Sequence, residues 1–251
     1  MPTDEINSVP EMLEKMNILM SATNLRWWFR GHSSAAWHLE PKVRRGYSQV
    51  QEKYFTNEFF VRAKLRSIDF PEIDDQAGQL AMMQHHGLPT RLLDWSRSPL
   101  IAAFFATERF QPYYEQSIDG PACIWALAPI VLNVRQGFED FLYPMSAKTV
   151  LPMIEPAFKT RDDNGKVISV MAVETDLRML IQQGAFTVHA TDVPLDLMAD
   201  CSDWLIKYII PTQSIPSMAR DLDILGIRRG DLFPDLDNLA TELMGIHQPR
   251  H

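Results

Sequence analysis

The residues best suited to chemistry lie close together in the segment 84–107, QHHGLPTRLLDWSRSPLIAAFFAT. Its polar candidates are His85, Arg91, Asp94, Ser96 and Arg97. Histidine transfers protons near neutral pH, arginine binds phosphate or carboxylate, and a carboxylate can orient a basic or hydroxyl group. The stretch TRLLDW predicts a strand, and the following Ser-Pro starts a predicted helix. Strand-end side chains and free helix N–H groups then face one crevice, which predicts a polar site.

Arg30 is a second candidate, because FRGH places it at the end of a predicted strand. A guanidinium is a planar, permanently charged fork that suits phosphate or carboxylate, and Gly31 would let a ligand approach the backbone. A structural salt bridge is the alternative, since the chain has 32 acidic residues. Gly31 and His32 are grouped with Arg30 as ligand-binding candidates.

The other candidates also have structural alternatives. His85 can transfer a proton, or its charge can stabilise the C-terminal end of a helix. Ser96 can bind a ligand or cap the helix that follows it. Gln182 and Gln183 precede a strand-like AFTVH, where their amides can read a polar ligand edge or close a turn. The remaining ligand-binding candidates are Thr90 and Arg91.

Composition restricts the class of protein. A chain of 251 residues that is 46% hydrophobic can bury one large core, and a net charge of -8 argues against a protein that coats duplex nucleic acid. No apolar run reaches the roughly 18–20 residues of a membrane helix. Two distant cysteines without a signal-peptide pattern predict reduced thiols and a cytoplasmic protein. Without HExxH, CxxC, GxSxG, Walker or GxGxxG patterns, we expect no metal site and no common hydrolase or nucleotide motif.

The hydrophobic pattern predicts an α+β (α/β mixed) single domain, in which helices flank a sheet. Helices are expected at 7–20, 52–68, 75–86, 217–225 and 233–244, and strands at 25–32, 90–95, 121–131, 179–189 and 204–211. A short extended piece is expected at 36–45. Segment 132–170 has the weakest pattern and is predicted to be a mobile or inserted loop.

Five motifs occur in order along the chain: WWFRGH, WHLEP, the segment 84–107, RMLIQQGAFTVH and GIRRGDLFPDLDNLA. Together they closely resemble the FRG-domain family, named for its Phe/Tyr-Arg-Gly motif and found in bacteria and phages. The resemblance implies an N-terminal helical extension at 1–25, an FRG domain at 26–240 and a C-terminal tail at 241–251.

The order of the motifs is also distantly similar to that of ADP-ribosyltransferases. In that family a first strand carries an Arg or His before a Gly, a second leads into an apolar helix, and a third carries a catalytic Glu. The resemblance implies a split mixed or antiparallel sheet, with Arg30 on phosphate or ribose and Ser96 on the nicotinamide side. Arg178 stands where the acid is expected, and Glu174 lies nearby.

Our first hypothesis is therefore an NAD-dependent, ADP-ribosyltransferase-like effector of toxin or phage-defence type. NAD is its expected substrate, with Arg30, His85, Asp94, Ser96 and Glu174 as catalytic candidates. A protein or nucleic acid is the expected acceptor, a product of the same operon is an expected partner, and no membrane is involved. The alternatives are a module that binds a nucleotide or phage component without turnover, and a nuclease that uses His85 and Asp94.

Overall fold

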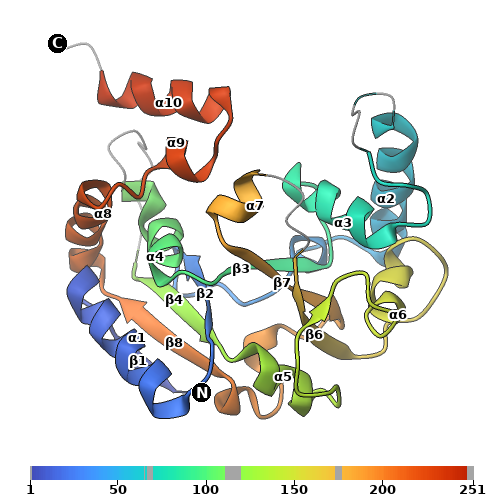
Figure 1. Ribbon diagram of the computed structural model, residues 1–251, viewed down its shortest axis with the longest axis horizontal. Coiled ribbons are helices and arrows are strands. Elements are labelled where there is room, and N and C mark those ends of the chain that lie inside the picture. Colours follow the sequence, from blue (N-terminus) through green and yellow to red (C-terminus); the bar gives the residue numbers. More distant parts are fainter. Residues whose placement is uncertain (1, 65, 67–69, 111–119, 173–176, 248–251) are drawn as a thin grey trace.

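The computed structural model of the protein describes residues 2–64, 66, 70–110, 120–172 and 177–247. Within these residues, eight strands form one sheet in the order β1-β8-β4-β2-β3-β7-β6-β5 (Figure 1). The β1–β8 and β5–β6 pairs are parallel and the other pairs are antiparallel. The strands are β1 (Thr3–Glu5), β2 (Trp28–His32), β3 (Leu92–Ser96), β4 (Ala122–Leu127), β5 (Tyr143–Pro144), β6 (Lys166–Met171), β7 (Gly184–Ala190) and β8 (Leu205–Ile210). The predicted mixed α+β class is confirmed.

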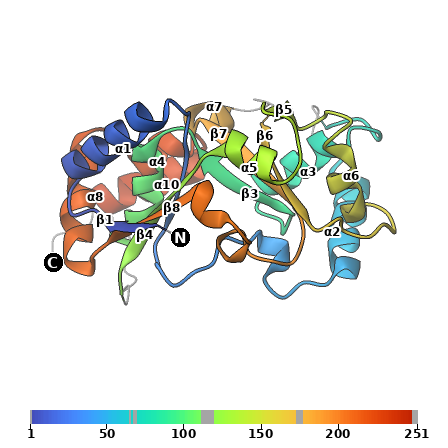
Figure 2. The ribbon, with the colours of Figure 1, turned by 90° about the horizontal axis from the view of Figure 1, so that it is seen from below.

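Helices flank both ends of this sheet. They are α1 (Val9–Thr23), α2 (Gln49–Ala63), α3 (Gln76–His85), α4 (Pro99–Thr107), α5 (Pro129–Arg135), α6 (Leu151–Ile154), α7 (Leu177–Ile181), α8 (Ile215–Ile224), α9 (Arg229–Leu232) and α10 (Leu236–Ile246). Figures 1 and 2 show α1, α4 and α8 at one end, beside β1 and β8, and α2, α3 and α6 at the other. None of the helices in the described part of the chain is long and apolar enough to cross a membrane.

Local sequence explains where several helices begin. The Ser8 side chain accepts a hydrogen bond from the Glu11 amide at the start of α1, and Asp75 does the same for Gly78 at α3. Such caps satisfy helix N–H groups that have no partner within the helix. The helices predicted at 7–20 and 75–86 are therefore confirmed.

Two buried clusters divide the interior between the ends of the sheet. The larger packs β4 and β2 against α1, α4 and α8, with Phe29, Phe104 and Trp125 fully buried. The smaller packs β6 and β7 against α3 and α6, around residues such as Leu80 and Val188. The junction of β2 with β3 lies between these two regions.

This junction is the weakest pairing at the centre of the sheet. β2 pairs with β4 through five residues and β3 pairs with β7 through five, whereas β2 and β3 share the single pair Phe29 and Ser96. A bond from the Arg30 Nη1 atom to the Asp94 carbonyl, at 2.6 Å, joins the two strands beyond that pair. The eight strands thus form one continuous sheet, where a split sheet was expected, and the β2–β3 junction rests on one backbone pair and on this side-chain bond.

Four predictions about elements are wrong. The strand predicted at 179–189 begins only at Gly184, because the residues before it form helix α7 and a turn. The strand predicted at 121–131 ends at Leu127, because Pro129 begins helix α5, where proline suits the first turn. Segment 132–170 is not a loop, since it contains β6, whose four central residues are buried. A strand buried on both faces lacks the alternation that marks a half-exposed strand. The extended piece expected at 36–45 contains only a short 3-10 turn, Lys42–Arg44.

Candidate functional site

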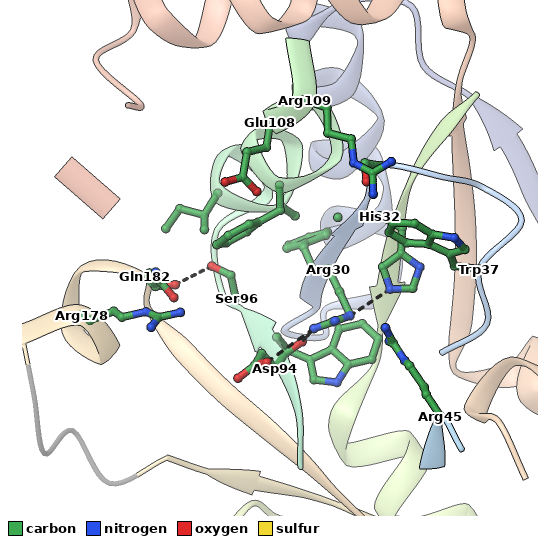
Figure 3. Close-up of a pocket in the computed structure, with 17 residues that line it drawn as sticks. Arg30, His32, Trp37, Arg45, Asp94, Ser96, Glu108, Arg109, Arg178 and Gln182 are labelled. Carbon is green, nitrogen blue, oxygen red and sulfur yellow. Dashed lines mark hydrogen bonds and ion pairs between the residues drawn. The ribbon is translucent and has the colours of Figure 1, made fainter. Parts of the chain in front are cut away.

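A pocket of about 370 Å³ opens beside the β2–β3 junction (Figure 3). Its walls come from β2, β3, α4 and the residues that follow α4, from the loop after β2, and from α7 and the turn after it. The lining residues are Phe29, Arg30, Gly31, His32, Ser33, Trp37, Arg45, Asp94, Trp95, Ser96, Ile101, Ala102, Phe105, Glu108, Arg109, Arg178 and Gln182. The volume lies near the lower end of the range of about 300–1,000 Å³ that is typical of small-molecule sites.

Arg30 lies in this pocket with its side chain 20% exposed. Its Nη1 atom donates to the Asp94 carbonyl at 2.6 Å, and its Nε atom donates to His32 Nε2 at 3.0 Å. The Asp94 carboxylate is 3.9 Å away, at the limit of an ion pair. Burial lowers the pKa of Arg30. The negative charge of Asp94 acts against this shift, and the positive charge of Arg45 adds to it. The guanidinium is held in place mostly by neutral groups, so its charge is only partly balanced.

His32 is the neutral group that orients Arg30. Burial, and then the charges of Arg30 and Arg45, lower the pKa of His32 to about 2. A neutral imidazole has one acceptor nitrogen, and the Arg30 N–H occupies Nε2. His32 therefore cannot serve as a general acid at neutral pH, and it acts as a support for the arginine.

Asp94 and Ser96 line the same pocket, but the Asp94 side chain is more exposed and less completely hydrogen-bonded than that of Ser96. The Asp94 side chain is 54% exposed, and one of its oxygens accepts a bond from the Gln84 amide at 2.7 Å. The Ser96 hydroxyl donates to the Gln182 carbonyl at 2.8 Å and accepts from the Ser98 amide at 3.0 Å. Ser96 thus fixes the end of β3 to the turn before β7, and Asp94 is the group that can contact a ligand.

Gly31 has no room for a side chain because helix α4 packs against it. A Cβ atom at this position would lie 1.9 Å from the Ala102 carbonyl oxygen and 2.5 Å from the Ala106 amide nitrogen. Both atoms belong to α4, which packs directly on β2. We expected a ligand to approach the backbone at Gly31. In the structure it is α4 that lies against this backbone. The Arg-Gly pair therefore combines a pocket side chain with a packing site for the helix beside it.

Trp37, Arg45, Glu108 and Arg109 also line the pocket, and the sequence analysis did not predict them as site residues. Trp37 and Arg45 come from the loop after β2, where no periodic pattern exists. The Arg109 guanidinium lies 5.0 Å from the centre of the Trp37 ring, and Trp37 is 41% exposed. Glu108 and Arg109 follow α4. Their spacing from Ile101 and Phe105 matches one face of a helix, so this periodicity was a usable signal.

The pocket has more cationic than anionic side chains. Four arginines line it, Arg30, Arg45, Arg109 and Arg178, against two carboxylates, Asp94 and Glu108. Glu108 forms an ion pair with Arg229, which lies outside the pocket lining. Within the described residues, no carboxylate lies within ion-pair distance of Arg45, Arg109 or Arg178. Figure 3 shows these guanidinium groups on different sides of one hollow, which suits an anionic ligand.

Arg91 and Thr90 lie outside the pocket. Arg91 is fully buried, and its guanidinium makes two bonds to the Glu52 carboxylate, at 2.9 and 2.6 Å, and one to Asp163 at 2.8 Å. The Thr90 hydroxyl is buried and donates to the Gln84 side chain. Their contacts hold the protein interior together, and the structure does not bring them to the predicted ligand site.

The remaining predicted residues are divided. Gln182 lines the pocket, but its side-chain amide donates to the Leu232 carbonyl at 2.9 Å. Gln183 lies outside the lining and closes a turn with a φ of 49°, as its structural alternative predicts. His85 ends α3 outside the lining, and its carbonyl accepts from Arg178 at 3.2 Å. Glu174 lies outside the described residues. Among the residues that the structure covers, no group of three His, Cys, Asp or Glu side chains could hold a metal ion.

Comparison with known proteins gives one match. The model of the FRG domain matches residues 25–115. Comparisons with curated proteins and with solved structures gave no significant match. The matched segment supplies every described lining residue except Arg178 and Gln182. This match covers the segment that builds most of the pocket. The predicted extension of the domain to residue 240 stays a prediction.

Proposed function

We propose that the pocket beside Arg30 binds a nucleotide through its phosphate groups, with NAD as the first candidate ligand. The excess of arginine over carboxylate in the lining is the observation that carries the proposal. Guanidinium groups bind phosphate oxygens through two parallel N–H bonds, and they do so more strongly where water is partly excluded. Arg30, with its side chain 20% exposed, is the central group.

Aromatic side chains in the pocket lining suit a flat ring. Trp37 is partly exposed and carries the Arg109 guanidinium near its face, and Phe105 lines the same pocket. Nucleotide bases stack on aromatic rings and on arginine, at about 1–3 kcal/mol per base. A base at Trp37 and phosphates at Arg30 would occupy both parts of the pocket.

A calorimetric titration tests this proposal. We expect wild-type protein to bind NAD or ADP-ribose, with affinity that decreases as salt increases, because exposed charge interactions are screened. Arg30→Gln should abolish most of the binding. Arg220→Gln is the matched control, because Arg220 is exposed on α8 and outside the pocket. Absence of heat and of thermal stabilisation in wild type at millimolar NAD, ADP-ribose and pyrophosphate would refute the proposal.

ADP-ribosyl transfer is a second candidate, favoured by the exposure of Asp94. Its carboxylate lies in the pocket next to Arg30, where it can hold a ribose hydroxyl or stabilise positive charge that develops on the ribose ring. Release of nicotinamide from labelled NAD, lost in Asp94→Asn, would support transfer. Binding without nicotinamide release would leave a nucleotide-binding module. No observation favours a nuclease, since His85 lies outside the pocket that Asp94 lines.

A further inference from the structure

The C-terminal part of the chain lies along the rim of the pocket. We call residues 229–247 the C-terminal clasp; it contains α9, Phe233 and α10. Arg229 pairs with Glu108, the Leu232 carbonyl accepts from Gln182, and the Phe233 ring lies 6.0 Å from that of Phe105. Glu108, Gln182 and Phe105 all line the pocket. The clasp is therefore attached to the same side chains that form one wall of the site.

Two guanidinium groups lie near the Phe233 ring. The Arg178 and Arg229 guanidinium carbons are 4.6 and 4.9 Å from its ring centre. A guanidinium stacks on a ring through its flat face, whereas its N–H groups point outward in the plane. Arg178 can thus stack on Phe233 and donate to a pocket anion at the same time. The ring and the anion do not compete for this arginine.

Helix α10, the last part of the clasp, has few buried residues that would hold it in place. In α10 only Glu242 is buried, and its carboxylate accepts from the Gly230 amide within the clasp itself. Leu236 and Leu243 of α10 are 80% and 47% exposed. Figure 1 shows α10 outside α9, away from the sheet. Leu232 of α9 is buried in the larger hydrophobic cluster and Phe233 packs against that cluster, so these two residues and the rim contacts hold the clasp, whereas α10 adds little buried apolar surface and should open at low free energy.

We propose that the C-terminal clasp completes the ligand pocket, and that docking of the clasp and binding of an anionic ligand reinforce one another. The proposal rests on the proposed nucleotide binding and names a control element for it. Phe233 is a positioning residue that holds Arg178 toward the pocket. Arg229 neutralises Glu108, which would otherwise repel phosphate from the same wall. Because coupling between two equilibria is reciprocal, ligand must stabilise the docked clasp as much as the clasp stabilises ligand.

Hydrogen–deuterium exchange and calorimetry with ADP-ribose as the probe test the coupling. In wild type, ADP-ribose should slow exchange across residues 229–247. Phe233→Leu keeps an apolar side chain but loses the ring face, so affinity should decrease about three- to tenfold and exchange in the free protein should accelerate. Phe233→Tyr should restore both, because the ring returns. Leu236→Ala, an exposed change in α10, is the control and should alter neither.

Variants of the Arg229–Glu108 ion pair at the rim of the pocket give an independent test of the coupling. Arg229→Gln should weaken ADP-ribose binding, and adding Glu108→Gln should recover it, because the unbalanced carboxylate is then removed. The coupling is refuted if Phe233→Leu and Arg229→Gln bind ADP-ribose as wild type does and the ligand leaves exchange in the clasp unchanged. Nucleotide binding still stands in that case if Arg30→Gln weakens binding. If wild type binds none of ADP-ribose, NAD and pyrophosphate, both proposals fail.

Discussion

Arg30 on β2 is partly exposed, Arg91 just before β3 is fully buried, and the two arginines differ in what surrounds their charge. Arg91 is bound by the carboxylates of Glu52 and Asp163, and Arg44 nearby pairs with Asp163 and Asp192. Arg30 is bound by a carbonyl and a histidine, with its nearest carboxylate oxygen at 3.9 Å. The first centre is closed and saturated with carboxylates, and the second is open and cationic.

The pKa values of the two arginines reflect this difference. Burial lowers the pKa of Arg91, but hydrogen bonds and charges from Glu52 and Asp163 more than compensate, so that it lies above its ordinary value. Burial lowers the pKa of Arg30, and Asp94 does not compensate fully. An arginine therefore stabilises the fold at position 91, whereas at position 30 its charge is available for a ligand. The partner set determines which role an arginine has.

Removal of Arg91 should have the largest effect on stability. Arg91→Ala leaves the buried carboxylate of Glu52 without its cation, which should cost about 3–5 kcal/mol in the free energy of unfolding. Urea denaturation at pH 7 measures the change. The double variant Arg91→Met with Glu52→Leu should recover much of the loss, because neither buried charge of that pair remains. A small effect of Arg91→Ala alone would contradict a structural role for this centre.

Removal of Arg30 should affect binding more than folding. We expect Arg30→Gln to weaken ADP-ribose binding by about 1.5–3 kcal/mol, the usual value of a hydrogen bond to a charged group. Its unfolding free energy should change less than that of Arg91→Ala, since no carboxylate is bonded as closely to Arg30. Calorimetric affinity and urea denaturation of the same samples measure both. Equal destabilisation by the two variants would remove the distinction between the centres.

A neutral histidine lies near each arginine and should make stability sensitive to acid. Burial, followed by neighbouring arginines, lowers the pKa of His32 to about 2 and that of His189 to about 3. The unfolded chain takes up these protons near pH 6.5, whereas the native state does not. Stability is therefore complete above pH 6.5 and decreases below it, by about 1–2 kcal/mol per histidine between pH 7 and pH 5.

Denaturation of His32→Gln and His189→Gln at both pH values separates these contributions. Each variant should show a smaller loss of unfolding free energy between pH 7 and pH 5 than wild type. An anionic ligand should raise the pKa of His32, which lines the pocket, more than that of His189, which does not. A pH dependence that neither substitution reduces would show that these histidines are not the cause.

Removal of Arg109 should have the smallest effect. Its guanidinium lies near the Trp37 ring at the partly exposed edge of the pocket. We expect Arg109→Gln to weaken ADP-ribose binding by about 0.5–1 kcal/mol, with no measurable change in unfolding free energy. Calorimetry at two salt concentrations measures the effect and its screening. An effect as large as that of Arg30→Gln would move the centre of the site to the Trp37 wall.

Local features were predictable where a local physical cause exists. Ser8 and Asp75 cap two helices that begin close to the start of the predicted ranges 7–20 and 75–86, and FRGH forms the predicted strand end with Arg30 in the pocket. β6 escaped prediction because its buried residues have no alternating pattern. Trp37 and Arg45 escaped because a loop without periodicity brings them to the pocket. Ser96 and Gln182 both line the pocket, and the bond from the Ser96 hydroxyl to the Gln182 carbonyl depends on a contact between distant segments.

The sequence by itself determined the local elements, the resemblance to the FRG domain and the polar segment that leads from β3 into α4. It could not determine which arginine faces a ligand, because the partners that decide this lie far along the chain. Glu52 and Asp163 are 39 and 72 residues from Arg91. Only the tertiary structure brings them to Arg91 and leaves Arg30 without an equivalent carboxylate. Long-range electrostatic balance, which leaves no local pattern in a sequence, separates the structural arginine from the one in the pocket.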